Sequence, residues 1–140
     1  MCPRVSVTRV EHFSAAHRLF NPKLSKEENE NIFGKCAGEN GHGHNFQMEV
    51  TVYGEVNPVT GMVINLNNLK RIIDTSVMIP LDHKNLDKDV DYFRNSGVVS
   101  TSENIAVFIW KCLRPHIDLK LDLEVKLHET YKNIFTYRGD

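Results

Sequence analysis

The stretch GHGHNFQMEVTVY, residues 41–53, decides the fold class because it holds the clearest periodic pattern in the chain. From residue 46 onward, apolar side chains alternate with polar ones, which is typical of a β-strand that buries one face and exposes the other. We therefore predict a half-buried strand over residues 44–53. Its inward-facing side chains are Phe46, Met48, Val50 and Val52.

Two other regions of the chain extend this strand into a sheet. Residues 4–18 are rich in Val, Thr and Phe and predict a long first strand, in which the alternation falters at Arg9 and Glu11 as it would at a β-bulge. Residues 121–128 alternate again, and a turn at residues 131–133 leads into a last strand near the end of the chain. The sequence therefore predicts four strands.

Two main helices are predicted between the second and third strands. Asn65 can cap a helix that must stop before Pro80, because proline lacks the backbone N–H that a helix interior uses. The next helix opens with the capping-box spacing of Ser100 and Glu103, and Pro115 closes it. Their apolar stripes are Leu66, Leu69, Ile72, Ile73 and Val77 in the first helix and Ile105, Phe108, Ile109, Cys112 and Leu113 in the second.

These elements give one α+β domain over residues 1–140, with a four-stranded antiparallel sheet and two helices on one face in the order ββααββ. A further short helix, started by the capping box of Ser25 and Glu28 and ended by Gly34, lies between the first two strands. The sheet has two long edges, and neither edge strand has an interior proline to prevent pairing. We therefore expect subunits to pair through these edges.

The composition narrows the class of protein. The chain has 140 residues, of which 41% are hydrophobic, so it can bury a core without a structural metal. Its 17 Lys and Arg residues and 18 Asp and Glu residues give a formal net charge of -1 without a long run of like charges, so nucleic acid and anionic membranes are poor candidate partners. The N-terminus has no apolar signal core, and the cysteines are odd in number and far apart. These features favour a cytoplasmic protein without disulfides.

Three histidines form a candidate metal site. His42 and His44 are two residues apart on a predicted strand, so their imidazoles point the same way, and Gly43 between them leaves the backbone free to bend towards a shared ion. His17, at the end of the first strand, would supply a third ligand. An isolated His-Gly-His sequence can equally be a chance turn, but three histidines that leave the fourth zinc position open are typical of catalytic zinc. The other histidines expected to be solvated are His12, His116 and His128.

Cys36 lies six residues before His42, on a loop that must approach the metal. With Lys35 beside it and a dication nearby, the ionised thiol would be stabilised, as a nucleophile or a proton-abstracting base requires. Cys36 could equally be a fourth zinc ligand, and the sequence leaves both roles open. Cys112, by contrast, belongs to a helical stripe and is expected to be a small buried side chain.

Three further residues are candidates for chemistry. Asp82 and His83 lie in a polar segment outside any periodic pattern and could form a proton-relaying pair, although a solvated loop explains them as well. Glu129 falls on the same strand face as Val125 and Leu127, where the alternation calls for an apolar residue. Because an unpaired buried charge is costly, either a ligand with two adjacent N–H donors or an internal Lys or Arg should face it.

Together these residues resemble animal 6-pyruvoyl tetrahydropterin synthases over nearly the whole chain. The resemblance rests on residues 13–19, 33–45, 58–65, 80–87, 100–110 and 128–130. It implies zinc ligands at His17, His42 and His44, catalytic roles for Cys36, Asp82 and His83, and a pterin-anchoring carboxylate at Glu129. Thr101 and Ser102 stand where the family usually has two threonines, and the resemblance implies ring contacts at these two residues and at Thr130.

The resemblance also implies an architecture and a reaction. The fold would be a T-fold, in which three subunits close a twelve-stranded barrel and two trimers stack as a homohexamer with sites between subunits. The reaction would convert 7,8-dihydroneopterin triphosphate into 6-pyruvoyl-tetrahydropterin and triphosphate, on the path to tetrahydrobiopterin. The implied cofactor is Zn²⁺, and the sequence leaves open whether Mg²⁺ assists with the triphosphate. No dinucleotide fingerprint or P-loop occurs, which agrees with a reaction that needs neither nicotinamide nor flavin.

Two other functions are compatible with the sequence. The first is 6-carboxy-tetrahydropterin synthase, which shares the implied fold, zinc site and substrate but usually spaces its cysteine closer to His-Gly-His than the five intervening residues here. The second is a non-catalytic zinc-binding module in which Cys36 closes the coordination shell. Product analysis separates the first from the implied reaction, and zinc retention by Cys36→Ala separates the second.

Overall fold

The structure, a computed structural model, describes residues 2–140 and is centred on a sheet with the strand order β3-β1-β2-β4-β5. The strands are β1 (Arg4–His17), β2 (His42–Glu55), β3 (Lys84–Asn85), β4 (Asp122–Thr130) and β5 (Asn133–Tyr137). The four longer strands pair antiparallel, whereas β3 runs parallel to β1 at Ala15 and Ala16. The sheet is therefore mixed and five-stranded, and the predicted four-stranded antiparallel sheet is wrong in this respect, because a two-residue strand has no alternation to detect.

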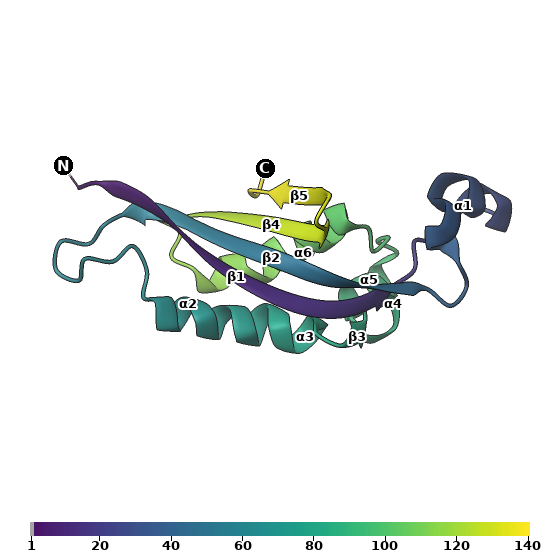
Figure 1. The fold of residues 1–140 in the computed structure, drawn as a ribbon, viewed down its shortest axis with the longest axis horizontal. Helices are drawn as coiled ribbons and strands as arrows, with labels where there is room; N and C mark the ends of the chain where they lie inside the picture. Colours follow the sequence, from purple (N-terminus) through teal and green to yellow (C-terminus); the bar gives the residue numbers. More distant parts are fainter. Residues whose placement is uncertain (1) are drawn as a thin grey trace.

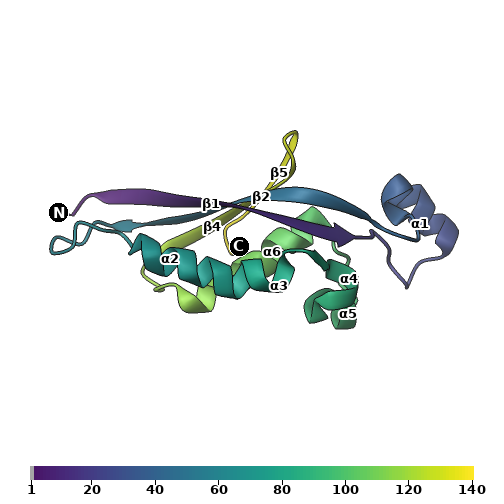
Figure 2. The same ribbon diagram turned by 60° about the horizontal axis from the view of Figure 1, so that its bottom comes forward.

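The helices are α1 (Lys26–Phe33), α2 (Leu66–Ile73), α3 (Ile79–Leu81), α4 (Leu86–Asp89), α5 (Asp91–Ser96) and α6 (Ser102–Leu113). In Figure 1, α1 projects from one end of the sheet, away from the others. Figure 2 shows the remaining helices on one side of the strands and no helix on the other side. The two predicted main helices correspond to α2 and α6, while α4 and α5 lie in and after a segment predicted as a loop. Across residues 2–140, every helix is too short or too polar to cross a bilayer.

The core lies between the sheet and α2 with α6. The four predicted inward-facing side chains of β2 are fully buried, which confirms the strand assignment. They contact one cluster that includes Leu69 and Ile73 from α2 and Ile105 and Ile109 from α6. Burying each such side chain stabilises the fold by about 1.5–3 kcal/mol before the loss of chain entropy is counted.

β1 and β2 pair in one uninterrupted register over the whole of β1, so the predicted bulge is absent. Arg9 and Glu11 face the helix side of the sheet but lie at its edge, where the Arg9 Nη2 atom is 2.7 Å from the Glu11 carboxylate. The break in alternation therefore reflects an ion pair at the edge. A register shift occurs instead in β4, between His128 and Thr130.

The predicted stop before Pro80 is also wrong. α2 continues through a π-helical segment, η2 (Asp74–Met78), directly into α3. The N–H of Ile79 bonds to the carbonyl of Asp74, five residues earlier, which widens this turn. The wider turn accommodates the proline ring that would clash in a regular α-helix. The helix therefore continues past Pro80. It ends at Leu81, immediately before Asp82.

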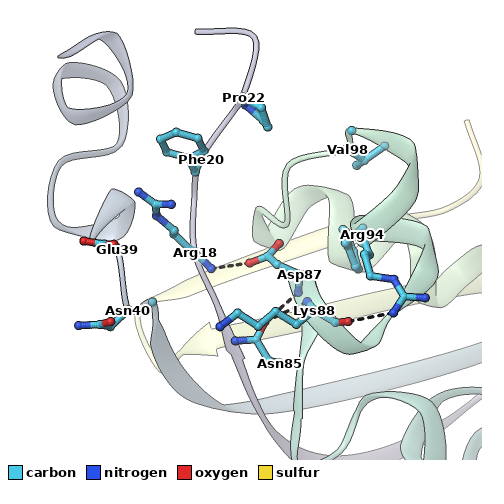
Figure 3. Close-up of a pocket in the computed structure, with 13 residues that line it drawn as sticks. Arg18, Phe20, Pro22, Glu39, Asn40, Asn85, Asp87, Lys88, Arg94 and Val98 are labelled. Atoms are coloured by element: carbon cyan, nitrogen blue, oxygen red, sulfur yellow. Dashed lines mark hydrogen bonds between the residues drawn. The ribbon is translucent and has the colours of Figure 1, made fainter. Parts of the chain in front are cut away.

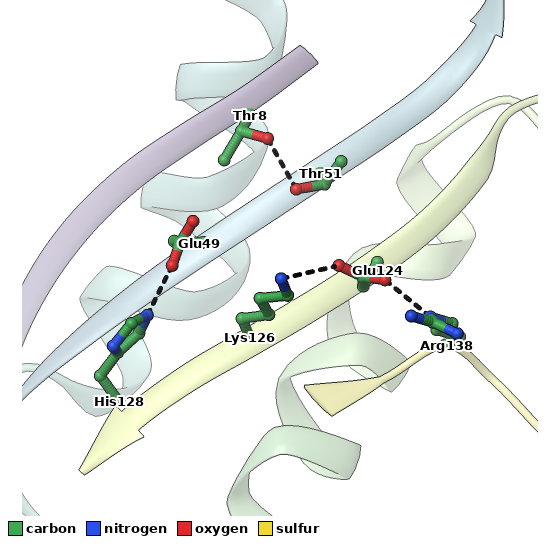
Figure 4. A network of polar contacts seen from close by, with 7 residues as sticks. All are labelled: Thr8, Glu49, Thr51, Glu124, Lys126, His128 and Arg138. Carbon is green, nitrogen blue, oxygen red and sulfur yellow. Dashed lines mark hydrogen bonds and ion pairs between the residues drawn. The ribbon is translucent and has the colours of Figure 1, made fainter. Parts of the chain in front are cut away.

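The helix-free face of the sheet is polar, and its charged side chains pair with one another (Figure 4). His128 in β4 is half-buried and hydrogen-bonded to Glu49 of β2, so the prediction that it is solvated is wrong. Glu124 lies 2.7 Å from Arg138 and 4.0 Å from Lys126. The other two histidines predicted to be solvated, His12 and His116, are exposed, which confirms that prediction.

Candidate metal centre and active site

The three predicted histidine ligands meet at one end of the sheet. His17, the last residue of β1, lies directly opposite His42, the first residue of β2, and His44 follows on the same face. The ring centroids are 4.6 Å apart for His17 and His42, 5.3 Å for His17 and His44, and 4.9 Å for His42 and His44. One nitrogen of each ring lies within 4.8 Å of the others. Small rotations of the rings would bring all three to the Zn–N distance of about 2.0–2.1 Å.

A glycine allows the two strand ends to approach each other. Gly41 has a φ of 71°, and a Cβ atom at this position would lie 2.8 Å from the carbonyl oxygen of His17. Any other residue would clash and be strained there. The bend predicted at Gly43 does not occur, because β1 and β2 keep their regular pairing through it. Strand register and Gly41, rather than a bend, bring the imidazoles together.

His17 is fully buried and held in one orientation. Its Nδ1 donates a hydrogen bond to the carbonyl of Ser100 at 2.6 Å, which places the proton on Nδ1 and the free lone pair on Nε2. Within residues 2–140 that buried Nε2 has no hydrogen-bond partner. A buried polar atom without a partner is costly, and a metal ion bound by the cluster would satisfy it. The donor set therefore fits a metal.

Burial also favours the neutral forms of His17 and His42. It is the largest cause that lowers the pKa of His17, and the neighbouring His42 and His44 rings lower it further, against the opposing effect of the Ser100 carbonyl. Burial likewise lowers the pKa of His42, followed by the effect of His44, while Glu129 and Asp87 act in the opposite direction. A neutral ring offers the lone pair that a metal requires.

Glu129 in β4 faces this cluster. One carboxylate oxygen, Oε2, lies 4.0 Å from Nε2 of His44 and accepts a hydrogen bond from the hydroxyl of Ser102. The side chain is 22% exposed, so it is reachable from outside. The partners of Glu129 are thus a hydroxyl and an imidazole, and the predicted alternative of an internal Lys or Arg is wrong.

The hydroxyls of Thr101 and Thr130 serve the fold. Thr101 is the N-cap of α6, and its Oγ1 accepts the N–H of Asn104 at 3.2 Å. The capping box predicted from Ser100 and Glu103 therefore does not form, because the cap lies one residue later and Asn104 occupies the third helical position. Thr130 ends β4, and its Oγ1 accepts the N–H of Lys132 at 3.2 Å in the following turn.

Cys36 lies in the short 3₁₀ helix η1 (Gly34–Ala37), against the end of β1. Its carbonyl accepts the N–H of Leu19 at 2.8 Å, and the carbonyl of Ala37 accepts the Nε–H of Arg18 at 2.9 Å. The sulfur of Cys36 is not among the atoms that lie within 4.8 Å of one another in the cluster. The loop therefore approaches the site, while the thiol does not complete a four-ligand shell in this chain.

Asp82 and His83 form a pair directly after α3. Oδ1 of Asp82 lies 2.9 Å from Nδ1 of His83 and accepts the N–H of Ser14 at 2.9 Å. His83 has a φ of 62°, and it is the sole non-glycine residue with positive φ in the described chain. Its side chain is 82% exposed. The backbone of His83 is therefore strained, and its ring extends into solvent. Strained backbone conformations are common in functional sites.

A cavity of about 300 Å³ (Figure 3) is lined in part by residues that are next in sequence to two of the histidines. Its wall includes Arg18, which follows His17, and Gly41, which precedes His42. α4 and α5 supply the opposite wall, and the backbone N–H of Arg18 joins the two sides by donating to Asp87 at 2.7 Å. The sequence carries no motif for this cavity, because its residues come from segments without periodic pattern.

Comparisons with known proteins agree with these features. The family model described as 6-pyruvoyl tetrahydropterin synthase matches residues 6–140. The chain is 55% identical to a "6-pyruvoyl tetrahydrobiopterin synthase" from Poecilia reticulata, over 96% of this chain and 90% of that protein. It is 50% identical to the human protein of the same name, over 98% of this chain and 93% of that one. The solved structure of Caenorhabditis elegans 6-pyruvoyl tetrahydropterin synthase has a TM-score of 0.92 at 46% identity, over 99% of this chain and 98% of that chain.

Proposed function

Because the chain belongs to the 6-pyruvoyl tetrahydropterin synthase family, we propose that its three-histidine cluster is the zinc centre of that enzyme. The function is that of 6-pyruvoyl tetrahydropterin synthase, a lyase that converts 7,8-dihydroneopterin triphosphate into 6-pyruvoyl-tetrahydropterin and triphosphate in tetrahydrobiopterin biosynthesis. One observation carries the assignment of the centre: the buried Nε2 of His17, which lacks a partner in the described chain, faces two further imidazoles.

The donor set supports zinc as the ion. Three imidazole nitrogens suit Zn²⁺ and leave one coordination position for substrate. When bound, Zn²⁺ would polarise the hydroxyl oxygens of the substrate side chain and so acidify the adjacent C–H bonds. The residues of the chain do the positioning, because the Ser100 carbonyl fixes which nitrogen of His17 faces the ion.

Glu129 would anchor the pterin ring. A carboxylate can accept two parallel hydrogen bonds from the amino-pyrimidine edge, which fixes both the position and the plane of the ring. The hydroxyl of Ser102 holds one oxygen of Glu129 in place. Because that oxygen lies 4.0 Å from His44, a ring bound there would extend its side chain over the histidines. Thr101 and Thr130, at the ends of α6 and β4, would line the same ring site.

Cys36, Asp82 and His83 would carry the proton transfers. Cys36 would remove a proton from the carbon chain of the substrate, from a loop that is hydrogen-bonded to the end of β1. Asp82 and His83 would keep the thiol ionised and pass protons onward. Since His83 is exposed and held in a strained conformation, we propose that this pair acts in the site of a neighbouring subunit within a homohexamer.

The cysteines support a proposal about the cellular setting. Cys2, Cys36 and Cys112 are all free thiols. A catalytic thiol is preserved in a reducing compartment, which supports a cytoplasmic location. Geometry does not favour the non-catalytic zinc module, because that module needs a fourth protein ligand and the Cys36 sulfur lies outside the cluster.

The decisive experiment incubates purified protein with dihydroneopterin triphosphate, before and after removal of zinc by a chelator. We expect release of triphosphate and formation of 6-pyruvoyl-tetrahydropterin with the zinc-loaded protein, loss of both after chelation, and recovery when zinc is restored. A carboxylated product together with acetaldehyde would identify a 6-carboxy-tetrahydropterin synthase instead. Unchanged turnover in a verified zinc-free protein would exclude the proposed metal centre.

A further inference from the structure

We propose that the cavity beside the histidine cluster, lined by Arg18 and Lys88, binds the triphosphate group of the substrate. This inference rests on the proposed function and extends it to a part of the substrate for which neither the histidines nor Glu129 offers a cationic partner. A triphosphate carries several negative charges, and leaving them without paired donors in a protein site would be costly. The wall of this cavity supplies cations beside the metal ligands.

The position of the cavity suits the shape of the substrate. Glu129 lies beside His44, whereas the cavity begins at Gly41, on the other side of His42 along the same strand segment. Because two residues of a strand span about 6.6 Å, the ring anchor at Glu129, the metal ligands and the cavity at Gly41 lie one after another in this direction. The substrate has the same order of ring, three-carbon chain and triphosphate. A ring bound at Glu129 would therefore direct its triphosphate towards the cavity.

Arg18 is pre-organised to bind an anion. Its backbone N–H donates to Asp87 at 2.7 Å, its Nε donates to the carbonyl of Ala37 at 2.9 Å, and its guanidinium carbon lies 4.0 Å from the ring centroid of Phe20. In the described chain its terminal Nη1 and Nη2 atoms make no hydrogen bond. An arginine that is already fixed, with two free N–H donor groups, loses little entropy when a phosphate binds.

Lys88 supplies a second positive charge from α4. The first turn of this helix is held by Asn85, whose side chain accepts the N–H groups of Asp87 and Lys88. Figure 3 shows Lys88 extending towards the side of the cavity that carries Arg18, while the Arg94 guanidinium points away from it. Arg94 is also paired with Asp91. We therefore assign the contacts to Arg18 and Lys88, and Arg94 adds only long-range charge.

A second cavity on the other side of Arg18 is the competing location. It is lined by Lys26 and Lys35 and has a volume of about 550 Å³. The first cavity is favoured because it includes Gly41, which directly precedes a metal ligand, and because Asp87 in its wall acts electrostatically on His42. The Lys88→Met and Lys35→Met variants distinguish the two locations.

The test measures binding of inorganic triphosphate by calorimetry to chelator-treated protein, so that neither zinc nor the ring contributes. We expect Lys88→Met to raise the Kd by about tenfold, since a charge-assisted hydrogen bond to the phosphate is lost. Glu39→Gln, which removes a carboxylate from the cavity wall, should lower the Kd. Lys70→Met on the exposed face of α2 removes the same charge elsewhere and should leave the Kd unchanged.

The outcomes separate this inference from the proposed function. If wild-type protein does not bind inorganic triphosphate, or if Lys35→Met weakens binding and Lys88→Met does not, the assignment is overturned, whether or not the enzyme turns over. In the turnover assay, Lys88→Met should raise the KM for dihydroneopterin triphosphate while zinc content stays at the wild-type level. If Lys88→Met loses turnover while its Kd for inorganic triphosphate is unchanged, the result would also count against the assignment.

Discussion

At the scale of single residues, the fully buried imidazole of His17 and the half-buried imidazole of His42 link metal binding to protonation. Their pKa values are lowered from 6.5 mainly by burial, so the folded metal-free chain resists protons that an unfolded chain accepts. As the pH falls below about 6.5, the unfolded state gains those protons and stability falls; above it, this contribution is constant. We expect the melting temperature of chelator-treated protein to decrease as the pH is lowered from about 7 to about 5.

A matched pair of variants assigns this effect to the cluster. His42→Gln should flatten the pH dependence of the melting temperature, because one of the two shifted imidazoles is gone. His116→Gln, at an exposed position, should leave the dependence as in the wild type. Equal slopes in His42→Gln and wild-type protein would mean that carboxylates elsewhere dominate the acid response.

A substitution at Cys36 tests whether turnover and zinc retention depend on different residues. Since its sulfur lies outside the histidine cluster, Cys36→Ala should abolish turnover while zinc content and melting temperature stay near wild-type values. Cys2→Ala, which lies two residues before the start of β1 (Arg4–His17), serves as the control. Zinc can be measured by elemental analysis of the dialysed protein. Loss of zinc together with turnover would instead make Cys36 a zinc ligand.

A substitution at Glu129 tests whether this carboxylate anchors the pterin ring. Glu129→Gln keeps the size of the side chain but replaces one acceptor oxygen with a donor. Loss of a charge-assisted hydrogen bond costs about 1.5–3 kcal/mol, so the Kd for substrate should rise by about 10- to 100-fold. Glu124→Gln, on the helix-free face of the same strand, should leave that Kd unchanged. Equal substrate affinities in wild-type protein and Glu129→Gln would refute the anchoring role.

The histidine cluster was accessible to sequence reasoning because the spacing of His42 and His44 fixes a shared strand face. Glu129 was accessible because it violates the alternation of β4. The contact between His17 and Ser100 was not accessible, since it joins a strand end to a loop 83 residues later and leaves no local pattern. The pairing of His128 with Glu49 depends on the register between two strands, which their composition does not encode.

At the scale of elements, long segments with a strong period were predictable and short or exceptional ones were not. β2 and α6 follow their apolar periodicity, and α1 has the predicted capping box and terminal glycine. β3 has two residues, so no pattern can announce it. The helix over Pro80 depends on a π-turn that makes room for the ring, and residue preferences alone favour a break there.

The start of α6 yields a test of what Thr101 does. Its hydroxyl caps the helix, so Thr101→Ala should lower the free energy of unfolding by about 1 kcal/mol, whereas Thr101→Ser should preserve the cap. Urea denaturation measures both changes. If Thr101→Ala instead weakens substrate binding without any loss of stability, the hydroxyl serves the ring rather than the helix.

At the scale of the whole molecule, the sheet leaves hydrogen-bonding edges unpaired. β3 covers β1 at Ala15 and Ala16 alone, and no strand within residues 2–140 lies beyond β5. Unpaired edges of this length invite association, and closure into a barrel removes them. The pairing of three such chains would turn the helix-free face inward, where the polar side chains of Figure 4 already satisfy one another.

Hydrogen exchange tests this assembly in solution. In a single chain, an edge strand pairs on one side, so alternate amides of β5 (Asn133–Tyr137) and of the uncovered part of β1 would exchange quickly. If the edges pair between copies, all of these amides should be protected, and the mass in solution should be six times the chain mass of 16.1 kDa. A single-chain mass with alternating protection would contradict the barrel, and it would leave His83 without a neighbouring site to serve. The proposed sharing of Asp82 and His83 therefore depends on the same measurement as the closure of the sheet.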